Sequence, residues 1–159
     1  MIQERQNLCC CPMKITNKKA FYDYTIIERL EAGVSLMGSE VKSLRAGLGK
    51  LDGAFVKLLS GQPYLINAEI PIYKFSRPEG YDPKRSRRLL LHKREIVSLA
   101  SKLDSQKLTL VPLSWYTTGH RVKLEIGLAR GKKEYEKREK IRREDQKRDL
   151  EREFRGKVK

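Results

Sequence analysis

The last 31 residues, 129–159, are expected to be too highly charged to contribute to a globular core. They hold 14 Lys/Arg and 8 Asp/Glu, a net charge of +6. The segment has few large apolar side chains, and these form no stripe along its length that could pack on a core: Tyr135, Ile141, Leu150, Phe154 and Val158. Residues 13–128 must therefore form the folded domain, and about a hundred residues are enough to bury one core.

The same segment still has helical leanings, because pairs of opposite charge stand four residues apart. Each such pair stabilises a helix by about 0.2–0.5 kcal/mol, and the pairs are Glu134/Arg138, Glu136/Lys140, Glu139/Arg143 and Glu144/Arg148. We expect residues 129–159 to be disordered or fraying alone and to become helical when bound. The simpler interpretation is a charged end that keeps the chain soluble.

Residues 1–12 contain every cysteine of the chain as one triplet, Cys9–Cys11. Adjacent cysteines cannot join distant parts of a fold. A metal site would need more ligands nearby, and the two histidines are far along the chain at His92 and His120. We expect an unstructured leader, with Met13 as an alternative start. The leader has an acidic residue and no apolar run, so it is not a secretion signal, and we expect a cytoplasmic protein.

The body, residues 13–128, reads as short strands with two small helices. A helix is predicted at 39–47, with Ser39 as its N-cap and Gly47 at its stop, and another at 93–103. Residues 74–88 are predicted to be a basic loop. Aromatic and β-branched runs predict the strands: Phe21–Ile27, Val34–Met37, Phe55–Leu59, Tyr64–Ile70, Leu108–Leu113, Ser114–Thr118 and Arg121–Leu128. This pattern indicates a mainly β fold, a closed or half-closed antiparallel barrel with peripheral helices.

The charge balance points to a polyanionic partner. Against 20 Asp+Glu stand 35 Lys+Arg, a net charge of +15, which implies nucleic acid or an anionic membrane. No apolar stretch approaches the roughly 18–20 residues of a membrane-spanning helix, which disfavours the membrane. No nucleotide-binding, dinucleotide-binding or zinc-protease motif occurs, so we expect neither catalysis nor a cofactor or metal.

Cations gather at three places in the body. The densest is Lys84–Arg94, with six Lys/Arg among eleven residues and no acid, where the apolar triplet Leu89–Leu91 is expected to anchor the flanking cations. Lys42 and Arg45 share one face of the predicted helix, and Asn17–Lys19 is the third place. One patch on a barrel face is a possible arrangement, and a solvated surface is the plainer alternative. The candidate contacts from charge are Asn17, Lys18, Lys19, Lys42, Arg45, Arg85, Arg87, Arg88 and Lys93.

Several motifs together resemble the small protein B family. They cover about residues 17–143 and stand in the family's order: Asn17-Lys18-Lys19-Ala20, Glu31-Ala32-Gly33, Gly38-Ser39-Glu40-Val41-Lys42-Ser43-Leu44-Arg45-Ala46-Gly47, Arg88-Leu89-Leu90-Leu91-His92 and Gly131-Lys132-Lys133. The resemblance implies an oligonucleotide-binding (OB) barrel with extra helices. It also implies an RNA-binding adaptor that binds the tRNA-like domain of transfer-messenger RNA and delivers it to stalled ribosomes in trans-translation.

The resemblance also implies roles for single residues. Glu31, Leu90 and His92 match positions that the family uses for this RNA, although some members carry Asn in place of His92. Glu31 could equally be a solvated acid and Leu90 a core residue. The C-terminal tail is expected to read the empty decoding centre and mRNA channel of the small subunit through Lys132, Lys133, Tyr135, Glu136, Lys137, Arg138, Lys140, Arg142 and Arg143. Elongation factor Tu is an expected partner, and the protein is expected to be a monomer.

Two other functions fit the same charge. One is a structural ribosomal protein whose basic tail threads between segments of ribosomal RNA. The other is an RNA-modifying enzyme, which the missing cofactor motifs disfavour.

Overall fold

The computed structural model describes residues 13–76, 80–106 and 108–135, together with Arg138, Arg142 and Gln146. The expected leader at 1–12 and most positions after 135 lie outside this part of the chain. The elements are β1 (Lys14–Thr16), α1 (Lys18–Asp23), β2 (Tyr24–Val34), α2 (Gly38–Arg45), β3 (Phe55–Leu59), β4 (Gln62–Ile66), β5 (Arg87–Leu90), α3 (Lys93–Gln106), β6 (Thr109–Thr118) and β7 (Arg121–Gly131).

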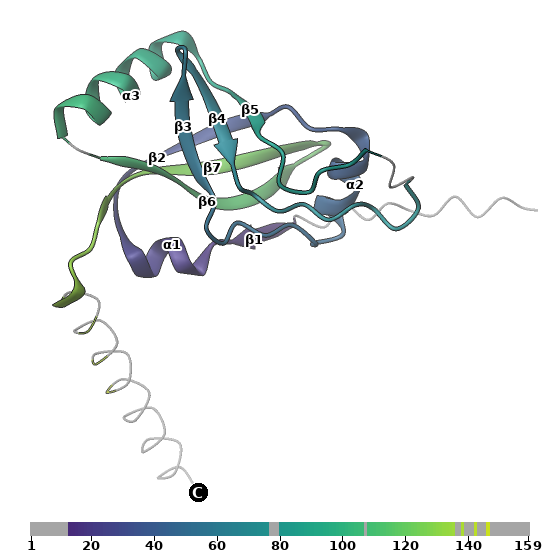
Figure 1. Cartoon of the computed structure of the whole chain (residues 1–159), viewed down its shortest axis with the longest axis horizontal. Coiled ribbons are helices and arrows are strands. Elements are labelled where there is room, and N and C mark those ends of the chain that lie inside the picture. Colours follow the sequence, from purple (N-terminus) through teal and green to yellow (C-terminus); the bar gives the residue numbers. More distant parts are fainter. Residues whose placement is uncertain are drawn as a thin grey trace, which may run out of the picture.

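The strands form one antiparallel sheet that curls into a ring, which confirms the predicted mainly β barrel (Figure 1). Along the sheet the order is β1-β6-β3-β4-β5-β2-β7, and a further pairing of β7 with β6 closes the ring, which leaves β1 as an extra strand on the edge of β6. The contact between β6 and β3 is short and rests on Val56 opposite Leu110. The ring is therefore held by many residue pairs between β6 and β7 on one side and by a single residue pair between β3 and β6 on the other.

The core lies inside this ring, because alternate residues of each strand point inward. In β7, Val122, Leu124 and Ile126 are buried, whereas Lys123 and Glu125 between them are only half-buried. Trp115 of β6 is fully buried among the same core residues. The outward positions of β2, β6 and β7 are thus free to carry polar groups.

The N-terminal part of the barrel differs from the prediction. Residues Phe21–Asp23 belong to α1, a helix that we did not predict, and β2 then runs without a break from Tyr24 to Val34. The strand predicted at Val34–Met37 is wrong, because β2 ends at its first residue and α2 begins at Gly38. Alternating exposure along β2 shows why the chain stays extended there, with one face on the core and one in water.

Other strand boundaries also shift. The two strands predicted between 108 and 118 are one strand, β6, with a bulge between Pro112 and Ser114. The strand predicted at Tyr64–Ile70 is shorter and ends at Ile66. β5 lies partly inside the predicted basic loop 74–88, and β7 continues past Leu128 to Gly131.

Both predicted helices are present, with one correction at a cap. The N-cap of α2 is Met37 rather than Ser39, and its backbone N–H donates a 2.8 Å hydrogen bond to Oε2 of Glu40. Gly47 follows α2 with φ of +77°, the left-handed conformation that a helix stop requires and glycine adopts without strain. None of the helices in the described part of the chain is long and apolar enough to cross a membrane.

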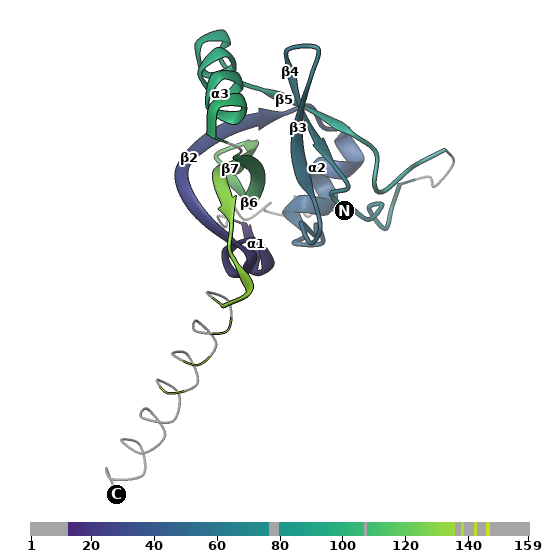
Figure 2. The same cartoon turned by 60° about the vertical axis from the view of Figure 1, so that its left-hand side comes forward.

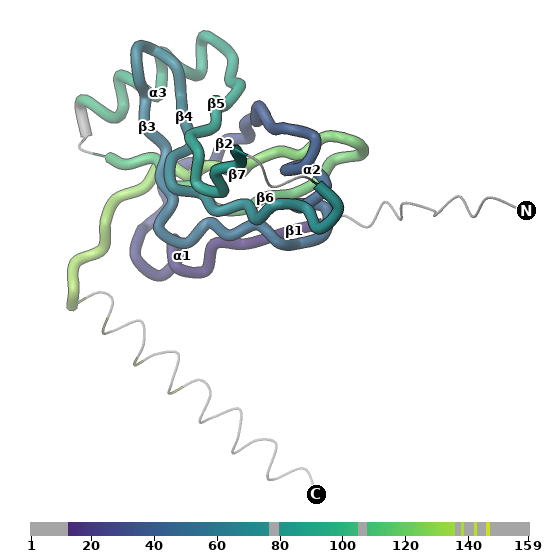
Figure 3. Tube along the Cα trace, turned by 45° about the vertical axis from the view of Figure 1, so that its right-hand side comes forward, coloured from purple at the N-terminus to yellow at the C-terminus, as the bar shows by residue number. Residues whose placement is uncertain are grey.

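The helices lie at separate corners of the barrel (Figures 1 and 2). α3 and the β3–β4 hairpin occupy one end, and α1 and β1 occupy the opposite end (Figure 3). α2 lies on a third side, beside the segment that joins β4 to β5. The helix α1, which carries Lys18 and Lys19, and the helix α2, which carries Lys42 and Arg45, thus lie on different sides of the barrel (Figures 1 and 2).

Candidate nucleic-acid interface

A groove runs over the outer face of β2, β6 and β7. Its volume is about 670 Å³, and its wall includes Lys14, Arg29, Glu31, Tyr116 and Glu125. We call it the Glu31 groove. Arg29 and Glu31 are two residues apart on β2 and so point to the same outer side of the sheet, and Glu31 lies directly opposite Glu125 in the sheet register. The groove therefore gathers charged groups from strands that are far apart in sequence.

Each acid of the groove is paired with a cation. Nζ of Lys123 donates to Oε2 of Glu31 at 3.0 Å. Nη1 of Arg29 donates to Oε1 of Glu125 at 3.3 Å, and the Ser114 hydroxyl donates to its other oxygen at 2.8 Å. The Glu31 side chain is 61% exposed, so its remaining lone pairs face water and are open to a ligand.

The environment of Glu31 keeps its carboxylate ionised. The nearby Tyr116 hydroxyl and then the Lys123 ammonium hold the pKa of Glu31 below its usual value of 4.5. Burial, followed by the Glu31 charge, raises the pKa of Tyr116. Within the described residues the covered Tyr116 hydroxyl makes no hydrogen bond of ordinary geometry, although it lies near enough to act on Glu31. At neutral pH, Glu31 is thus a hydrogen-bond acceptor only, suited to a ligand that donates.

Leu90 lies on the same outer face. It pairs with Gly33 in the register of β5 and β2, and Glu31 points to the same side because it is two residues from Gly33. The Leu90 side chain is 54% exposed. The interpretation of Leu90 as a core residue is therefore wrong. His92 follows β5 in an exposed position, and its backbone N–H donates to the Glu95 carboxylate at 2.8 Å.

The exposed face of α2 carries Lys42 and Arg45, as the sequence predicted. Nη2 of Arg45 donates to the backbone oxygen of His120 at 2.8 Å, which ties α2 to the turn between β6 and β7. Nζ of Lys42 lies 5.8 Å from the centre of the Tyr73 ring. Both cations are held on a rigid surface instead of on a loose loop.

Comparison with known proteins decides the family. The sequence profile of the SmpB protein family matches residues 14–156. The chain belongs to the SmpB family. The SsrA-binding protein of Sulfurihydrogenibium sp. is 50% identical over 144 residues, 91% of this chain and 95% of that protein. That of Persephonella marina is 46% identical with the same coverage. These matches confirm the resemblance to small protein B.

Solved structures agree with the sequence comparison. A chain of the structure described as "tmRNA-SmpB: a journey to the center of the bacterial ribosome" is 44% identical and superimposes with a TM-score of 0.65. The similarity covers 77% of this chain and 86% of that one. The barrel with its three helices is therefore the SmpB fold.

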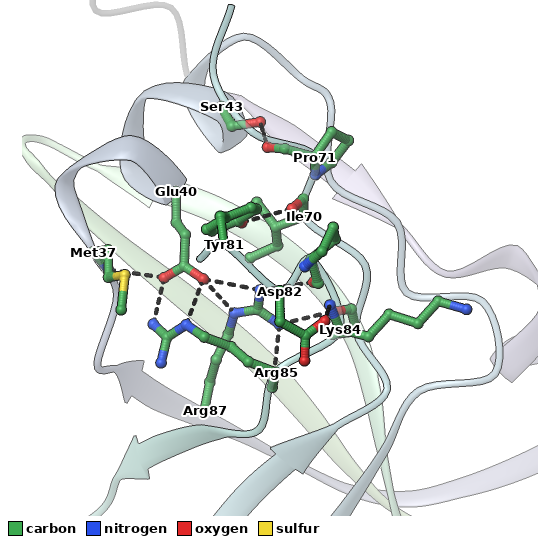
Figure 4. A network of polar contacts seen from close by, with 12 residues as sticks. Met37, Glu40, Ser43, Ile70, Pro71, Tyr81, Asp82, Lys84, Arg85 and Arg87 are labelled. Atoms are coloured by element: carbon green, nitrogen blue, oxygen red, sulfur yellow. Dashed lines mark hydrogen bonds and ion pairs between the residues drawn. The ribbon is translucent and has the colours of Figure 1, made fainter. Parts of the chain in front are cut away.

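Two cations expected to bind RNA have a structural role in this member of the SmpB family. Arg87 is fully buried, and its Nε donates to Oε1 of the fully buried Glu40 at 2.9 Å (Figure 4). Arg85 makes two bonds to the same carboxylate, at 2.9 and 2.6 Å. A guanidinium that is buried and fully bonded cannot reach a phosphate, so the predicted RNA contact at Arg87 is wrong, and Arg85 is occupied by Glu40.

This cluster joins α2 to the chain before β5. Arg87 also donates to the backbone oxygens of Ala68, Pro83 and Arg85. Nearby, the Ser43 hydroxyl of α2 donates to the oxygen of Pro71 at 2.6 Å (Figure 4). Charge-assisted bonds of this kind fix the segment between β4 and β5 against α2.

Asn17 and Lys132 are also structural in the SmpB barrel. Asn17 is 4% exposed, its Nδ2 donates to the oxygens of Leu51 and Pro112, and its Oδ1 accepts from the Ala20 N–H. Its amide is buried and both of its N–H groups are used inside the barrel, so the predicted RNA contact at Asn17 is wrong. Nζ of Lys132 donates to two backbone oxygens in the last turn of α1, a favourable place for a cation.

The other predicted cations of the body stay on the surface. Lys18, Lys19, Arg88 and Lys93 are exposed. Nη2 of Arg88 donates to the side-chain oxygen of Gln62 at 2.9 Å. Their roles in RNA binding remain predictions.

Only some predicted tail residues lie in the described part of the chain. Lys133, Tyr135, Arg138 and Arg142 are exposed, and the last three have helical backbone. Arg138 lies 3.7 Å from Glu134, one of the pairs that the sequence predicted. Four further tail predictions lie outside the described residues: Glu136, Lys137, Lys140 and Arg143.

Sequence reasoning missed most of the Glu31 groove. Arg29, Tyr116, Lys123 and Glu125 come together only through the register of β2, β6 and β7. The available signal was the alternation of polar and apolar residues in Arg121–Leu128, which marks the polar positions as outward. Among the described residues no group of three His, Cys, Asp or Glu side chains is placed to hold a metal.

Proposed function

We propose that this protein is an RNA-binding adaptor that binds the tRNA-like domain of transfer-messenger RNA and delivers it to stalled ribosomes. Membership of the SmpB family carries this proposal, since its relatives are SsrA-binding proteins and the similar solved chain is described together with tmRNA. Elongation factor Tu as a delivery partner, the monomeric state and the cytoplasm as location belong to the same proposal.

The Glu31 groove supplies chemistry suited to a folded RNA. Base edges that donate hydrogen bonds, such as those of guanine, match the ionised Glu31 carboxylate. Leu90 offers an apolar contact beside it, and Arg29 and Lys14 offer partners for phosphate. An acid in a cationic protein repels a generic polyanion, so its exposed position supports selective recognition over loose attraction.

The tail is the second part of the proposal. After Lys132 the chain leaves the barrel next to α1 (Figure 2). We infer that Tyr135 stacks on a ribosomal base and that the cations from Lys133 onward contact phosphates in the empty mRNA channel. An intact message in that channel would compete with the tail, which restricts action to stalled ribosomes.

The test is a binding measurement with the whole protein and a transcript of the tRNA-like domain at physiological salt. An RNA hairpin of equal length and heparin serve as controls. The proposal predicts a clear preference for the tRNA-like domain. Equal affinity for all three probes would contradict it and leave only nonspecific charge attraction.

A structural ribosomal protein would behave differently on a sucrose gradient. We expect this protein to be substoichiometric on ribosomes and to dissociate at raised salt. Stoichiometric, salt-resistant association would favour the structural role.

A further inference from the structure

Two aromatic rings in contact lie on the outside of the barrel, in the segment Pro71–Ser76. Phe75 is 80% exposed, more than any other exposed large apolar side chain in the described part of the chain. The ring centres of Tyr73 and Phe75 are 5.5 Å apart, and the rings meet edge to face at 62°. So exposed a ring adds little to the core, and its free face is available to a partner.

Cations flank both rings. Nζ of Lys42, on α2, lies 5.8 Å from the centre of the Tyr73 ring, and Nζ of Lys74 lies 5.9 Å from the centre of the Phe75 ring. Pro71–Ser76 contains no acidic residue. Aromatic faces with ammonium groups beside them are the combination on which unpaired bases stack while their phosphates meet the cations.

Hydrogen bonds at its base fix this segment. The Ser43 hydroxyl holds the oxygen of Pro71, and the Tyr81 hydroxyl donates to the oxygen of Ile70 at 2.6 Å (Figure 4). A backbone bond from the Ser76 N–H to the Tyr73 oxygen closes a turn around the rings. The rings are thus presented beside α2 in a defined position, which lowers the cost of ordering them on a ligand.

We infer that Tyr73 and Phe75, with Lys42 and Lys74, form a stacking site for one unpaired base of the RNA that the barrel binds. The inference rests on the proposed function and adds a base contact on a side of the barrel distinct from α1 and α3 (Figures 1 and 2). Lys42 links this site to the α2 face with Arg45, so one bound RNA strand can meet both. Aromatic faces flanked by Lys42 and Lys74 suit a nucleotide, which offers a flat base and a phosphate, better than a basic or neutral apolar peptide.

Tryptophan fluorescence tests the stacking directly. Phe75→Trp places an indole at the site, whereas the native Trp115 is fully buried and gives a constant background. We expect the tRNA-like domain transcript to quench the Phe75→Trp protein well beyond the wild type. Val97→Trp is the matched control, because Val97 is 70% exposed on α3, away from α2. Quenching no greater than in the Val97→Trp protein would overturn the inference.

Affinity gives the second readout. Phe75→Ala should weaken binding of the same transcript by about tenfold, as loss of one base–aromatic stack does, while Val97→Ala binds like the wild type. Equal binding by both variants would overturn the stacking site and leave the proposed function intact. If the wild type shows no preference for the transcript over heparin, the proposed function fails and the inference fails with it. Quenching by purified ribosomes but not by the transcript would also overturn it.

Discussion

The guanidinium of Arg87 lies 2.9 Å from the carboxylate of Glu40, and both side chains are completely buried. The two residues are 47 positions apart, so this pair closes a long loop of the chain. Arg87 also donates to three backbone oxygens, so the N–H groups of its guanidinium are hydrogen-bonded inside the fold. The densest run of cations in the body therefore includes a structural centre that holds β5 and the β4–β5 segment to α2.

Replacing Glu40 by Ala should destabilise the fold by about 3–5 kcal/mol, because it leaves the buried Arg87 charge without a partner. Urea denaturation of both proteins measures the difference. Asp52→Ala is the control, since Asp52 is an exposed acid and its loss should change stability by less than about 0.5 kcal/mol. Similar losses in the two variants would show that the buried pair is not stabilising.

Stability should fall in acid through the same carboxylate. Burial acts to raise the pKa of Glu40, but bonds from Arg85 and the Met37 N–H and the charge of Arg87 outweigh it, so the pKa is below 4.5. A lowered folded-state pKa gives stability that is complete above the ordinary glutamate range and is lost as pH falls through the folded-state value. The urea concentration at the denaturation midpoint, measured from pH 7 to pH 3, should therefore start to decrease once the pH falls below about 4.5. This decrease in the midpoint should be smaller in a Glu40→Gln protein. An equal decrease in both proteins would show that other titrating groups cause the loss of stability in acid.

Asn17→Ala separates structure from RNA binding. The amide caps α1 and bonds to the oxygens of Leu51 and Pro112, so its loss should cost about 1–3 kcal/mol of stability. Measured well below the melting transition, affinity for the tRNA-like domain should stay within about twofold of the wild type. A stable Asn17→Ala protein with much weaker RNA binding would show that Asn17 contacts the RNA after all.

Local patterns in the sequence predicted much of this fold. The strand Phe55–Leu59, the helix around Val41 and Leu44 and the stop at Gly47 follow from propensity, periodicity and turn chemistry over short distances. The helix α1 was missed although Asn17 is a strong N-cap residue, because its cations were interpreted as RNA contacts. Its length of six residues also gives too few turns for a periodic signal.

The misassigned residues depend on distant partners. No residue near Arg87 in the sequence indicates that Glu40 is its partner. The run of cations around Arg87 was therefore interpreted as a single exposed RNA-binding surface. The sequence Arg87-Arg88-Leu89-Leu90 does not alternate polar and apolar residues, so it does not indicate that Arg87 and Leu89 are buried while Arg88 and Leu90 are exposed. The partners of Glu31 follow from strand register, which a bulge in β6 shifts, and such a shift cannot be read from propensities.

The tail should fold only when bound. A peptide of residues 131–159 in buffer should show partial helix at most by circular dichroism, because an isolated helix without a docking face is marginal in water. In the whole protein, protease should remove this segment before it cuts the barrel. A stably helical peptide, or a tail as protease-resistant as the barrel, would contradict this proposal.

The most direct test of selective RNA recognition compares Glu31→Gln with Asp52→Asn. Each variant removes one exposed negative charge, so simple attraction to RNA should strengthen slightly and equally in both. If the Glu31 carboxylate accepts hydrogen bonds from the tRNA-like domain, Glu31→Gln should instead bind it about tenfold more weakly at physiological salt. Asp52→Asn should bind as tightly as the wild type or slightly more tightly. Equal or increased affinity in the Glu31→Gln protein would contradict the account.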